Sequence, residues 1–272
     1  MRKNKIVQCA VAVALTAALP LCLSAQQTLP YTTGFEAPTY SAGSLNGQDN
    51  WIVTDGTATV QNTVVQAGSQ AVKLDPNSTI DKAFDSGSYS SVWVEGYFRG
   101  EGSDGTPSFP SSPPASAIVF FDSTNGIRCY DGKQPGPDFF VNTGDTVSAS
   151  SWSKVTIKLN FTSKEWDCYV NDTLKLTALG FRDNSVTKFN GFTNFSSKES
   201  YLDSFRAIPF ILGDGNLDTE VNVGDVILLT NILNGATSTS DAIVLAHLDV
   251  AAPSGAPDNA DLTGLINLIL GK

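Results

Sequence analysis

The 272-residue chain has little of what most catalytic and nucleic-acid-binding sites require. It contains one His and one Met, and 16% of its residues are charged, against roughly 25% in an average soluble domain. Its formal net charge is −10, which argues against binding to nucleic acid or to an anionic lipid surface, because both need a basic face. A single His also leaves little material for imidazole acid–base chemistry or for a zinc site with several His ligands.

The N-terminal segment has the pattern of an export signal rather than of a folded element. Three basic residues open it, a mostly apolar run follows over 6–23, and Ser24-Ala25 supplies small residues. This pattern predicts a secretory signal peptide over 1–25, cleaved after Ala25, and a secreted or cell-surface protein. Two alternatives are a retained membrane anchor and a lipoprotein modified at Cys22. No later segment is long and apolar enough to span a membrane.

Only two cysteines lie outside this segment. In an exported protein the pair Cys129 and Cys168 is chemically able to form a disulfide. Both residues are equally compatible with buried free thiols. The sequence leaves these two readings open.

Residues 26–207 read as short strands separated by turns. From Trp152 to Phe161, apolar and polar side chains alternate, which predicts a half-buried strand, and Lys164–Asn171 and Thr173–Leu176 follow it. Further predicted strands are 51–53, 58–61, 71–74, 91–98, 117–121, 126–130, 191–195 and 201–208. Many short strands without a long helical pattern predict a mainly β protein with an antiparallel sandwich over 26–207. The Gly-, Ser- and Pro-rich stretch 100–114 is predicted to be a long surface loop.

The composition changes after Pro209, and residues 208–272 form a second predicted domain. Two apolar helical stretches, 226–233 and 262–270, repeat at a 36-residue offset. In each repeat an Asp marks the helix start and a Gly marks its end, as helix capping favours. The sequence therefore predicts a small duplicated loop–helix module.

The first loop of this module has the spacing of a calcium-binding loop. Oxygen-bearing residues occupy positions one, three, five, seven, nine and twelve: Asp214, Asn216, Asp218, Glu220 through its carbonyl, Asn222 and Asp225. Ca²⁺ takes six to eight oxygen ligands, and this spacing wraps them around one point. Thr219 stands at position six, where the sharp turn favours Gly. The alternative is a solvated acidic turn that binds nothing.

On these residues, the segment 213–272 resembles a type I dockerin, a module whose two calcium loop–helix units bind cohesin domains of extracellular scaffolds. The resemblance implies bound Ca²⁺ and a cohesin-like partner. The second loop departs from the pattern, because it is one residue longer and carries Ala251, Ala252 and Pro253 where early ligands belong. Its remaining candidate ligands are Asp249, Asp258 and Asp261. We expect a filled first site and a degenerate second one.

The first domain resembles the concanavalin A-like lectin/glucanase (LamG-like) jelly roll. The resemblance rests on Trp152–Asn160 with Trp166–Asn171, on Gly34-Phe35-Glu36 with 45–48, and on the closing Tyr201-Leu-Asp203-Ser204. The resemblance implies a jelly-roll fold. The family includes sugar-binding modules, adhesion modules and glycoside hydrolases. Glu36 and Asp203 are candidates to hold a structural cation.

A retaining hydrolase needs two carboxylates about 5–5.5 Å apart. The nearest pair in sequence, Glu95 and Glu101, would lie roughly 20 Å apart on an extended strand, so we predict no catalytic residue. The single His247 lies in the second domain and is predicted to be a surface or core residue without a catalytic role.

Sugar binding needs aromatic faces beside polar groups. The candidates are Trp93 and Tyr97 on one strand, Arg128 and Tyr130 on another, and Tyr169 on a third; Trp93 and Tyr97 are also compatible with sandwich core, and Trp166 is predicted to be core. We therefore predict a non-catalytic protein that binds polysaccharide or glycan, or recognises a cell surface. The alternatives are a glycoside hydrolase and a structural or adhesion protein that binds another protein.

Overall fold

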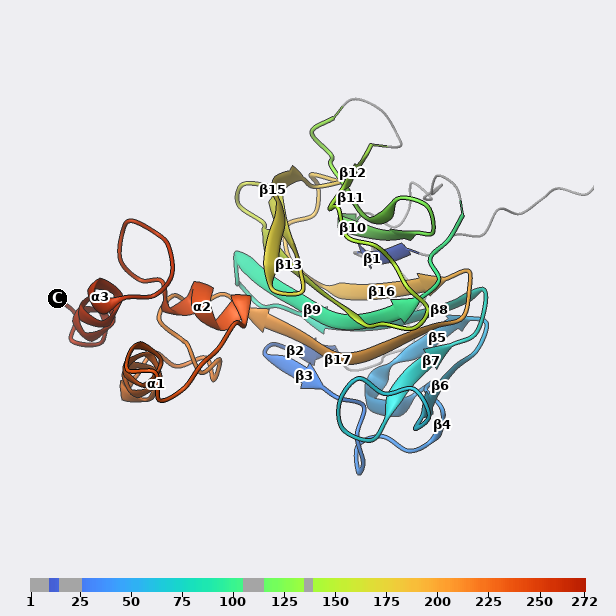
Figure 1. Cartoon of the computed structure of the whole chain (residues 1–272), viewed down its shortest axis with the longest axis horizontal. Helices are drawn as coiled ribbons and strands as arrows, with labels where there is room; N and C mark the ends of the chain where they lie inside the picture. Colours follow the sequence, from blue (N-terminus) through green and yellow to red (C-terminus); the bar gives the residue numbers. More distant parts are fainter. Residues whose placement is uncertain (1–9, 15–25, 105–114, 135–138) are drawn as a thin grey trace, which may run out of the picture. The chain divides into compact units, whose positions relative to one another are not determined.

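The computed structural model describes residues 10–14, 26–104, 115–134 and 139–272, and of 10–14 only the backbone. It divides into two compact units, Met1–Ala207 (unit 1) and Ile208–Lys272 (unit 2). Unit 1 is a β-sandwich and unit 2 contains three helices (Figure 1). Most of the loop predicted over 100–114 and most of the predicted leader lie outside the described residues.

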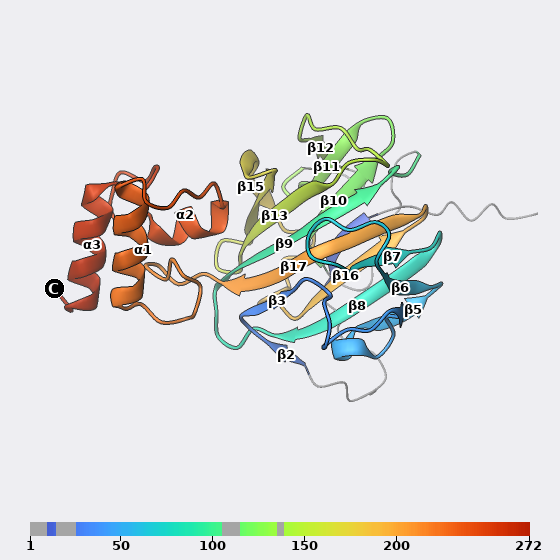
Figure 2. The ribbon, with the colours of Figure 1, turned by 60° about the horizontal axis from the view of Figure 1, so that its bottom comes forward.

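Unit 1 consists of two sheets whose strands pair almost entirely antiparallel. Sheet I has, in spatial order, β12 (Phe140–Asn142), β11 (Gly126–Tyr130), β10 (Ala115–Asp122), β1 (Ala10–Ala14), β16 (Gly191–Ser196), β8 (Ser78–Asp85) and β2 (Gln27–Thr28), with β5 (Ile52–Asp55) on β8. Sheet II has β15 (Thr173–Gly180), β14 (Glu165–Val170), β13 (Ser153–Asn160), β9 (Ser91–Gly100), β17 (Ser200–Pro209), β7 (Ala71–Leu74), β6 (Ala58–Gln61) and β4 (Gly43–Ser44), with β3 (Tyr31–Thr33) on β17. Figure 2 shows β9 and β17 of sheet II running side by side.

Strand β1 lies inside the segment predicted to be a leader. Its backbone pairs with β10 on one side and with β16 on the other. The predicted cleavage after Ala25 concerns processing, and it stays a prediction. A chain cleaved there would lack this strand of sheet I.

The core of unit 1 lies between the inward faces of the two sheets. Sheet I contributes Val119 and Cys129, among others, and sheet II contributes Ile157 and Trp166, all nearly fully buried. The two-residue alternation of a strand explains this, since every second side chain of a strand faces one way. Trp166 is core, as predicted.

One inward position of sheet I carries a charge. The side chain of Lys82 on β8 is completely buried, and its Nζ donates to the backbone carbonyl of Asp49 and to Asp49 Oδ2, the latter at 3.2 Å. Its ammonium lies 4.4 Å from the centre of the Tyr31 ring. Burial lowers the pKa of Lys82, and the Asp49 carboxylate opposes that effect. The charge is tolerated in the core because it has a partner.

Unit 2 has helices α1 (Val223–Leu233), α2 (Ala242–Leu248) and α3 (Asn259–Ile269). Two helices were predicted; α2 was not, because its seven residues are too few to show a helical period. Leu229, Leu248 and Leu265, one from each helix, form the buried centre of the unit. Gly235 and Gly271 follow α1 and α3 with φ of 72° and 65°, the left-handed conformation that the predicted Gly caps require.

No helix among the described residues combines the length and the apolar character needed to cross a membrane.

Candidate functional site

The first loop of unit 2 is organised around two buried carboxylates. Asp214 accepts the backbone N–H of Asp218 at 3.0 Å on Oδ1 and that of Thr219 at 2.9 Å on Oδ2. Asp225 accepts from Asn216 N at 3.1 Å and from the backbone of the helix cap at 2.9 Å. Both carboxylates are fully buried, so the loop folds over them.

The helix that follows the loop starts with a capping box. The Asn222 side chain accepts from Gly224 N at 2.7 Å, and the Asp225 side chain accepts from Asn222 N. Such reciprocal bonds satisfy orphan N–H groups of the first turn. Asp225 therefore serves the helix start whether or not it also holds a metal ion.

Thr219 adopts the turn geometry that its position demands. Its φ is 74°, and Leu217, two residues earlier, has φ of 62°. A left-handed backbone costs a β-branched residue roughly 1–2 kcal/mol. The loop thus keeps the sharp turn without glycine and carries that strain.

The donor set of this loop suits a hard cation. In the part of the chain that the structure describes, Asp214 and Asp225 have no Lys or Arg partner. Lys272 is the only Lys or Arg in the sequence of 208–272, which holds eight acidic residues. Burial raises the pKa of Asp214, although its backbone bonds lower it, and the charge of Asp225 raises it further. Among the described residues, the carboxylates of this loop do not converge as a group of three within 4.8 Å. A cation would neutralise two buried negative charges here.

The second loop keeps the same hydrogen-bond scaffold with fewer oxygen side chains. Asp261 accepts from Ala251 N and from Asp258 N, both at 2.7 Å. Asp258 caps α3, accepting from Ala260 N at 2.6 Å, and Asp249 accepts from Gly255 N at 3.1 Å. Its three candidate ligands are thus engaged in holding the loop and the helix start.

The buried His247 belongs to the packing of unit 2. Its ring nitrogens lie 2.8 Å from Ile243 O and 3.2 Å from Pro209 O, and its ring packs edge-on against Phe210 at 4.9 Å. This arrangement agrees with a core residue.

In unit 1, three of the five predicted sugar-binding residues share the outer face of sheet II, the face turned away from the core. Trp93 and Tyr97 lie on β9, and Tyr169 lies on β14 two strands away. The rings of Trp93 and Tyr169 are 5.4 Å apart, and Lys158 Nζ lies 5.4 Å from the centre of the Trp93 ring. Trp93 is buried, and its Nε1 has no hydrogen-bond partner within the described ranges, whereas Tyr97 and Tyr169 are partly exposed. Trp93 also lies outside the inter-sheet core.

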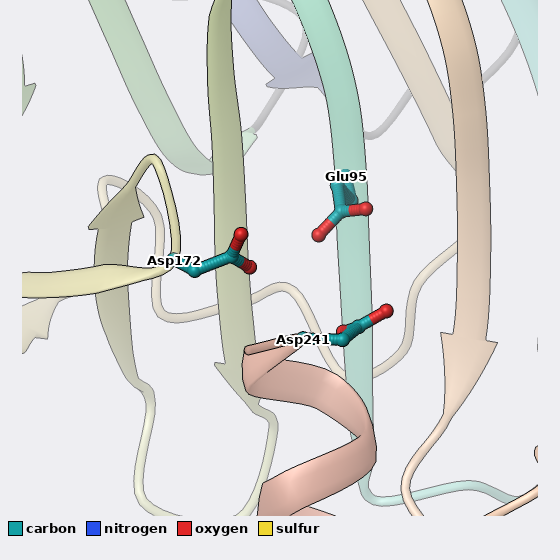
Figure 3. A group of neighbouring side chains, drawn as sticks. All are labelled: Glu95, Asp172 and Asp241. Atoms are coloured by element: carbon teal, nitrogen blue, oxygen red, sulfur yellow. The ribbon is translucent and has the colours of Figure 1, made fainter. Parts of the chain in front are cut away.

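The middle of this outer face is an ion cluster around Glu95. Its carboxylate accepts from Arg206 Nε at 2.8 Å and from Thr156 Oγ1 at 2.6 Å, and it lies 3.2 Å from Lys154 Nζ. Lys154 also pairs with Asp172 at 2.7 Å. Figure 3 shows Glu95 on β9 and Asp172 in the turn that follows β14. Glu95 is buried and fully engaged, and Glu101 is exposed beyond the end of β9, so the two do not form an acid–nucleophile pair.

The outer face continues into a cluster that the sequence analysis did not single out. Trp152, next to β13, and Tyr201 on β17 meet with ring centres 6.3 Å apart, and the Arg99 guanidinium lies 5.8 Å from the centre of the Tyr201 ring. Trp152 and Tyr201 were noted only as framework residues of the jelly-roll resemblance. One pattern in the sequence could have indicated this cluster. Arg99 lies an even number of positions along the chain from Trp93 and Tyr97, so a strand places all three side chains on the same face of the sheet.

The other two predicted sugar-binding residues lie on sheet I. Arg128 pairs with Asp122 at 3.1 Å and lies over the Phe140 ring at 5.4 Å, and Tyr130 packs edge-on against the same ring at 5.6 Å. Both are partly exposed. The five candidates therefore form two separate groups, one on each sheet.

Glu36 and Asp203, the candidates to hold a structural cation, both hold one loop through backbone bonds. Glu36 Oε1 accepts from Ser69 N at 2.8 Å and from Gln70 N at 3.0 Å, and Asp203 Oδ2 accepts from Gln66 N at 2.8 Å. Burial raises the pKa of Asp203 despite these bonds. Neither carboxylate needs a cation to be satisfied.

Cys129 and Cys168 are free, buried thiols on opposite sheets of the core. Burial raises the pKa of the Cys129 thiol, and the neighbouring Cys168 side chain adds to this. The two side chains face each other across the sandwich without a bond between them in this structure, and the sequence is compatible with a disulfide as well as with free thiols.

Comparison with known proteins supports the fold of unit 1. No family model matches the sequence, and no curated protein matches it. Among solved structures, a sialidase is similar at a TM-score of 0.50 and 11% identity, covering 84% of this chain and 21% of that chain. The cellulose-induced protein Cip1 is similar at 0.46 and 13%, covering 65% of this chain and 96% of that one, and the carbohydrate-binding module CBM66 of Bacillus subtilis at 0.38 and 13%, covering 58% and 94%. This chain spans about a fifth of the sialidase's length, and at 11% identity the similarity to it shows a shared fold alone.

Proposed function

We propose that this chain is an exported, non-catalytic glycan-binding protein whose unit 1 binds polysaccharide along the outer face of sheet II. One observation carries the proposal: partly exposed aromatic rings share this face with a hydrogen-bonded cluster of opposite charges. Pyranose rings stack on aromatic faces, and their hydroxyl groups need fixed donors and acceptors. On sheet I, Arg128 is engaged by Asp122 and the Phe140 ring, which makes that group the weaker candidate.

The test is calorimetric titration of the whole chain with a panel of polysaccharides in the presence of Ca²⁺. We expect Tyr97→Ala and Tyr169→Ala each to weaken binding by about fivefold, since one lost stacking contact is worth roughly 1 kcal/mol. Tyr130→Ala is the matched control, because it removes a partly exposed tyrosine from sheet I. Loss of binding in the control with no loss in the other two variants would move the site to sheet I.

A glycoside hydrolase is the second candidate, and the same mixtures can be assayed for new reducing ends. The engaged state of Glu95 speaks against it. Release of reducing ends that Glu95→Gln abolishes would replace the binding proposal with a hydrolase. Silence across the panel, with no cleavage, would favour a sandwich that binds another protein.

Unit 2 is proposed to act as a calcium-dependent, dockerin-like attachment module. The buried carboxylates of Asp214 and Asp225, which have no Lys or Arg partner among the described residues, support the Ca²⁺ site. Exposed apolar side chains on both long helices support a protein partner, among them Val223 and Ile227 on α1 and Ile266 and Leu268 on α3. A panel of type I cohesin domains tests the partner. Binding is expected with Ca²⁺, and it should be lost with a chelator or in Ile227→Asp.

A further inference from the structure

One end of the outer face of sheet II carries a compact group of two aromatic rings and a cation, here called the Trp152 site. It consists of Arg99, Trp152, Tyr201 and Glu199. The Trp152 and Tyr201 rings meet at 66°, and both are partly exposed. Arg99 stacks on Tyr201, which holds the guanidinium beside the rings. Three separate segments of sheet II thus bring their side chains to one spot.

Arg99 is held in place by a backbone carbonyl group. Its Nε donates to Ala149 O at 2.6 Å, which leaves the two Nη groups. Among the described residues, no carboxylate pairs with Arg99, whereas Lys73, Lys154 and Arg206 on the same sheet each have one. A guanidinium fixed at one nitrogen and open at two presents the planar fork that binds a carboxylate at both oxygens.

In the described part of the chain, the carboxylate bonded to Tyr201 is that of Glu199, and Lys73 compensates its charge. Glu199 accepts from the Tyr201 hydroxyl at 2.6 Å, and Lys73 Nζ lies 2.9 Å from its second oxygen. Its pKa is lowered by the Tyr201 bond and by Lys73. Because Lys73 compensates Glu199, the positive charge of Arg99 is available to a ligand. Glu199 in turn offers an acceptor for a sugar hydroxyl.

We propose that the Trp152 site binds the carboxylate-bearing sugar of an acidic polysaccharide, a hexuronic acid unit. The rings offer an apolar surface to the C–H face of the pyranose, and Arg99 takes its carboxylate. This inference rests on the proposed glycan-binding function and names its ligand class. A neutral sugar would use the rings and leave the fork of Arg99 without a carboxylate.

The experiment compares two ligands on the full chain with Ca²⁺ present. One is a hexasaccharide of a single hexuronic acid, and the other is the same oligomer with its carboxyl groups reduced to alcohols. The uronate is expected to bind at least about tenfold more tightly, since a charge-assisted contact is worth roughly 1.5–3 kcal/mol. Arg99→Gln should erase that difference, and Arg99→Lys should keep part of it, because Lys retains the charge without the fork.

Two further variants make the outcome specific. Lys188→Gln removes the same charge from a surface pair with Asp85, both about half exposed, and should leave the difference intact. Trp152→Ala should weaken both oligomers to a similar extent, because stacking does not depend on the carboxylate. Unchanged thermal melting of each variant shows that it is folded.

The possible failures are distinguishable. Equal binding of the two oligomers, or an Arg99→Gln variant that keeps the difference, overturns the uronate assignment and leaves glycan binding standing. If Trp152→Ala binds both oligomers as tightly as the unaltered chain does, the ligand does not bind at the Trp152 site. No binding of either oligomer or of any polysaccharide in the panel overturns the proposed function together with this inference.

Discussion

The two loop–helix halves of unit 2 share a scaffold and differ in what the scaffold encloses. In each half an Asp three residues beyond the helix cap accepts two backbone N–H groups, Asp225 with cap Asn222 and Asp261 with cap Asp258. Each half also places one Leu in the common centre. The first loop surrounds this scaffold with oxygen side chains, and the second replaces early ones with Ala251, Ala252 and Pro253.

The comparison distinguishes two roles of an Asp at the third helical position, which can accept hydrogen bonds at the helix start and can also bind Ca²⁺. A carboxylate at the third helical position can start a helix without a metal, because backbone N–H groups satisfy it. Asp261 is expected to do this alone, and Asp225 to do it while also holding Ca²⁺. The hydrogen-bond scaffold can therefore form in a loop that has lost its metal ligands. For this reason, the fact that α3 is a regular helix is no evidence of a second metal ion.

The strongest test of the shared scaffold removes the central leucines. Leu229→Ala and Leu265→Ala are each expected to cost about 2–5 kcal/mol of stability, because both side chains are fully buried. Hydrogen exchange of α1 and α3 in chelator measures the loss. A far smaller cost at Leu265 would break the comparison, since the two halves would not be equally packed.

The next test compares how much each of the two loops contributes to Ca²⁺ binding. Asp214→Ala should lower Ca²⁺ affinity by about a hundredfold, because it removes a buried charged ligand at position one. Asp249→Ala, its counterpart in the second loop, should change the affinity by less than about twofold. Titration calorimetry of chelator-treated protein measures both. Equal losses of Ca²⁺ affinity in the two variants would show that the second loop also binds Ca²⁺. An unchanged Ca²⁺ affinity in Asp214→Ala would contradict the proposed metal site in the first loop.

A third test distinguishes the two roles proposed for Asp225, which are to accept backbone hydrogen bonds at the helix start and to bind Ca²⁺. Asp225→Asn and Asp261→Asn are each expected to cost about 1–3 kcal/mol in chelator, since both weaken bonds to buried N–H groups. Adding Ca²⁺ should widen the deficit of Asp225→Asn and leave that of Asp261→Asn unchanged. Thermal melting with and without Ca²⁺ gives the four values, and a parallel response of the two variants would contradict the division of roles.

The smallest expected effect concerns the turn in the first loop. Thr219→Gly should stabilise the loop by about 1 kcal/mol and raise its Ca²⁺ affinity by up to roughly fivefold, because glycine adopts a φ of 74° without strain. Calorimetry on this variant is compared with Thr237→Gly, an exposed position after α1. A gain at the control alone would point to general flexibility rather than to relief of strain.

The sequence predicted the regular strands of unit 1 well where burial alternated cleanly. The predicted strand ending at Phe161 corresponds to β13, and 58–61, 71–74 and 126–130 match β6, β7 and β11. It missed β8, because Lys82 occupies an inward position and breaks the apolar alternation. The compensating partner Asp49 lies 33 residues away, beyond the reach of a local pattern.

The candidate sites show the same limit. The spacing of the first loop in unit 2 is local, so its residues could be read directly from the sequence. The aromatic face of unit 1 depends on which strands become neighbours, and the order β14–β13–β9–β17 is not encoded in any one segment. The sequence therefore gave no way to separate Arg128 and Tyr130 from Trp93 and Tyr97, or to join Trp152 with Tyr201.

The buried Lys82 gives the sandwich an internal reporter. Amine-acylating reagents modify solvent-exposed, uncharged amines, and the ammonium of Lys82 is wholly screened by Tyr31, Trp51 and Asp49. Acylation at Lys82 thus requires that these covering residues move away from its ammonium group. Its labelling rate, followed by peptide mass spectrometry beside that of the half-exposed Lys188, measures how often this buried position becomes exposed to solvent.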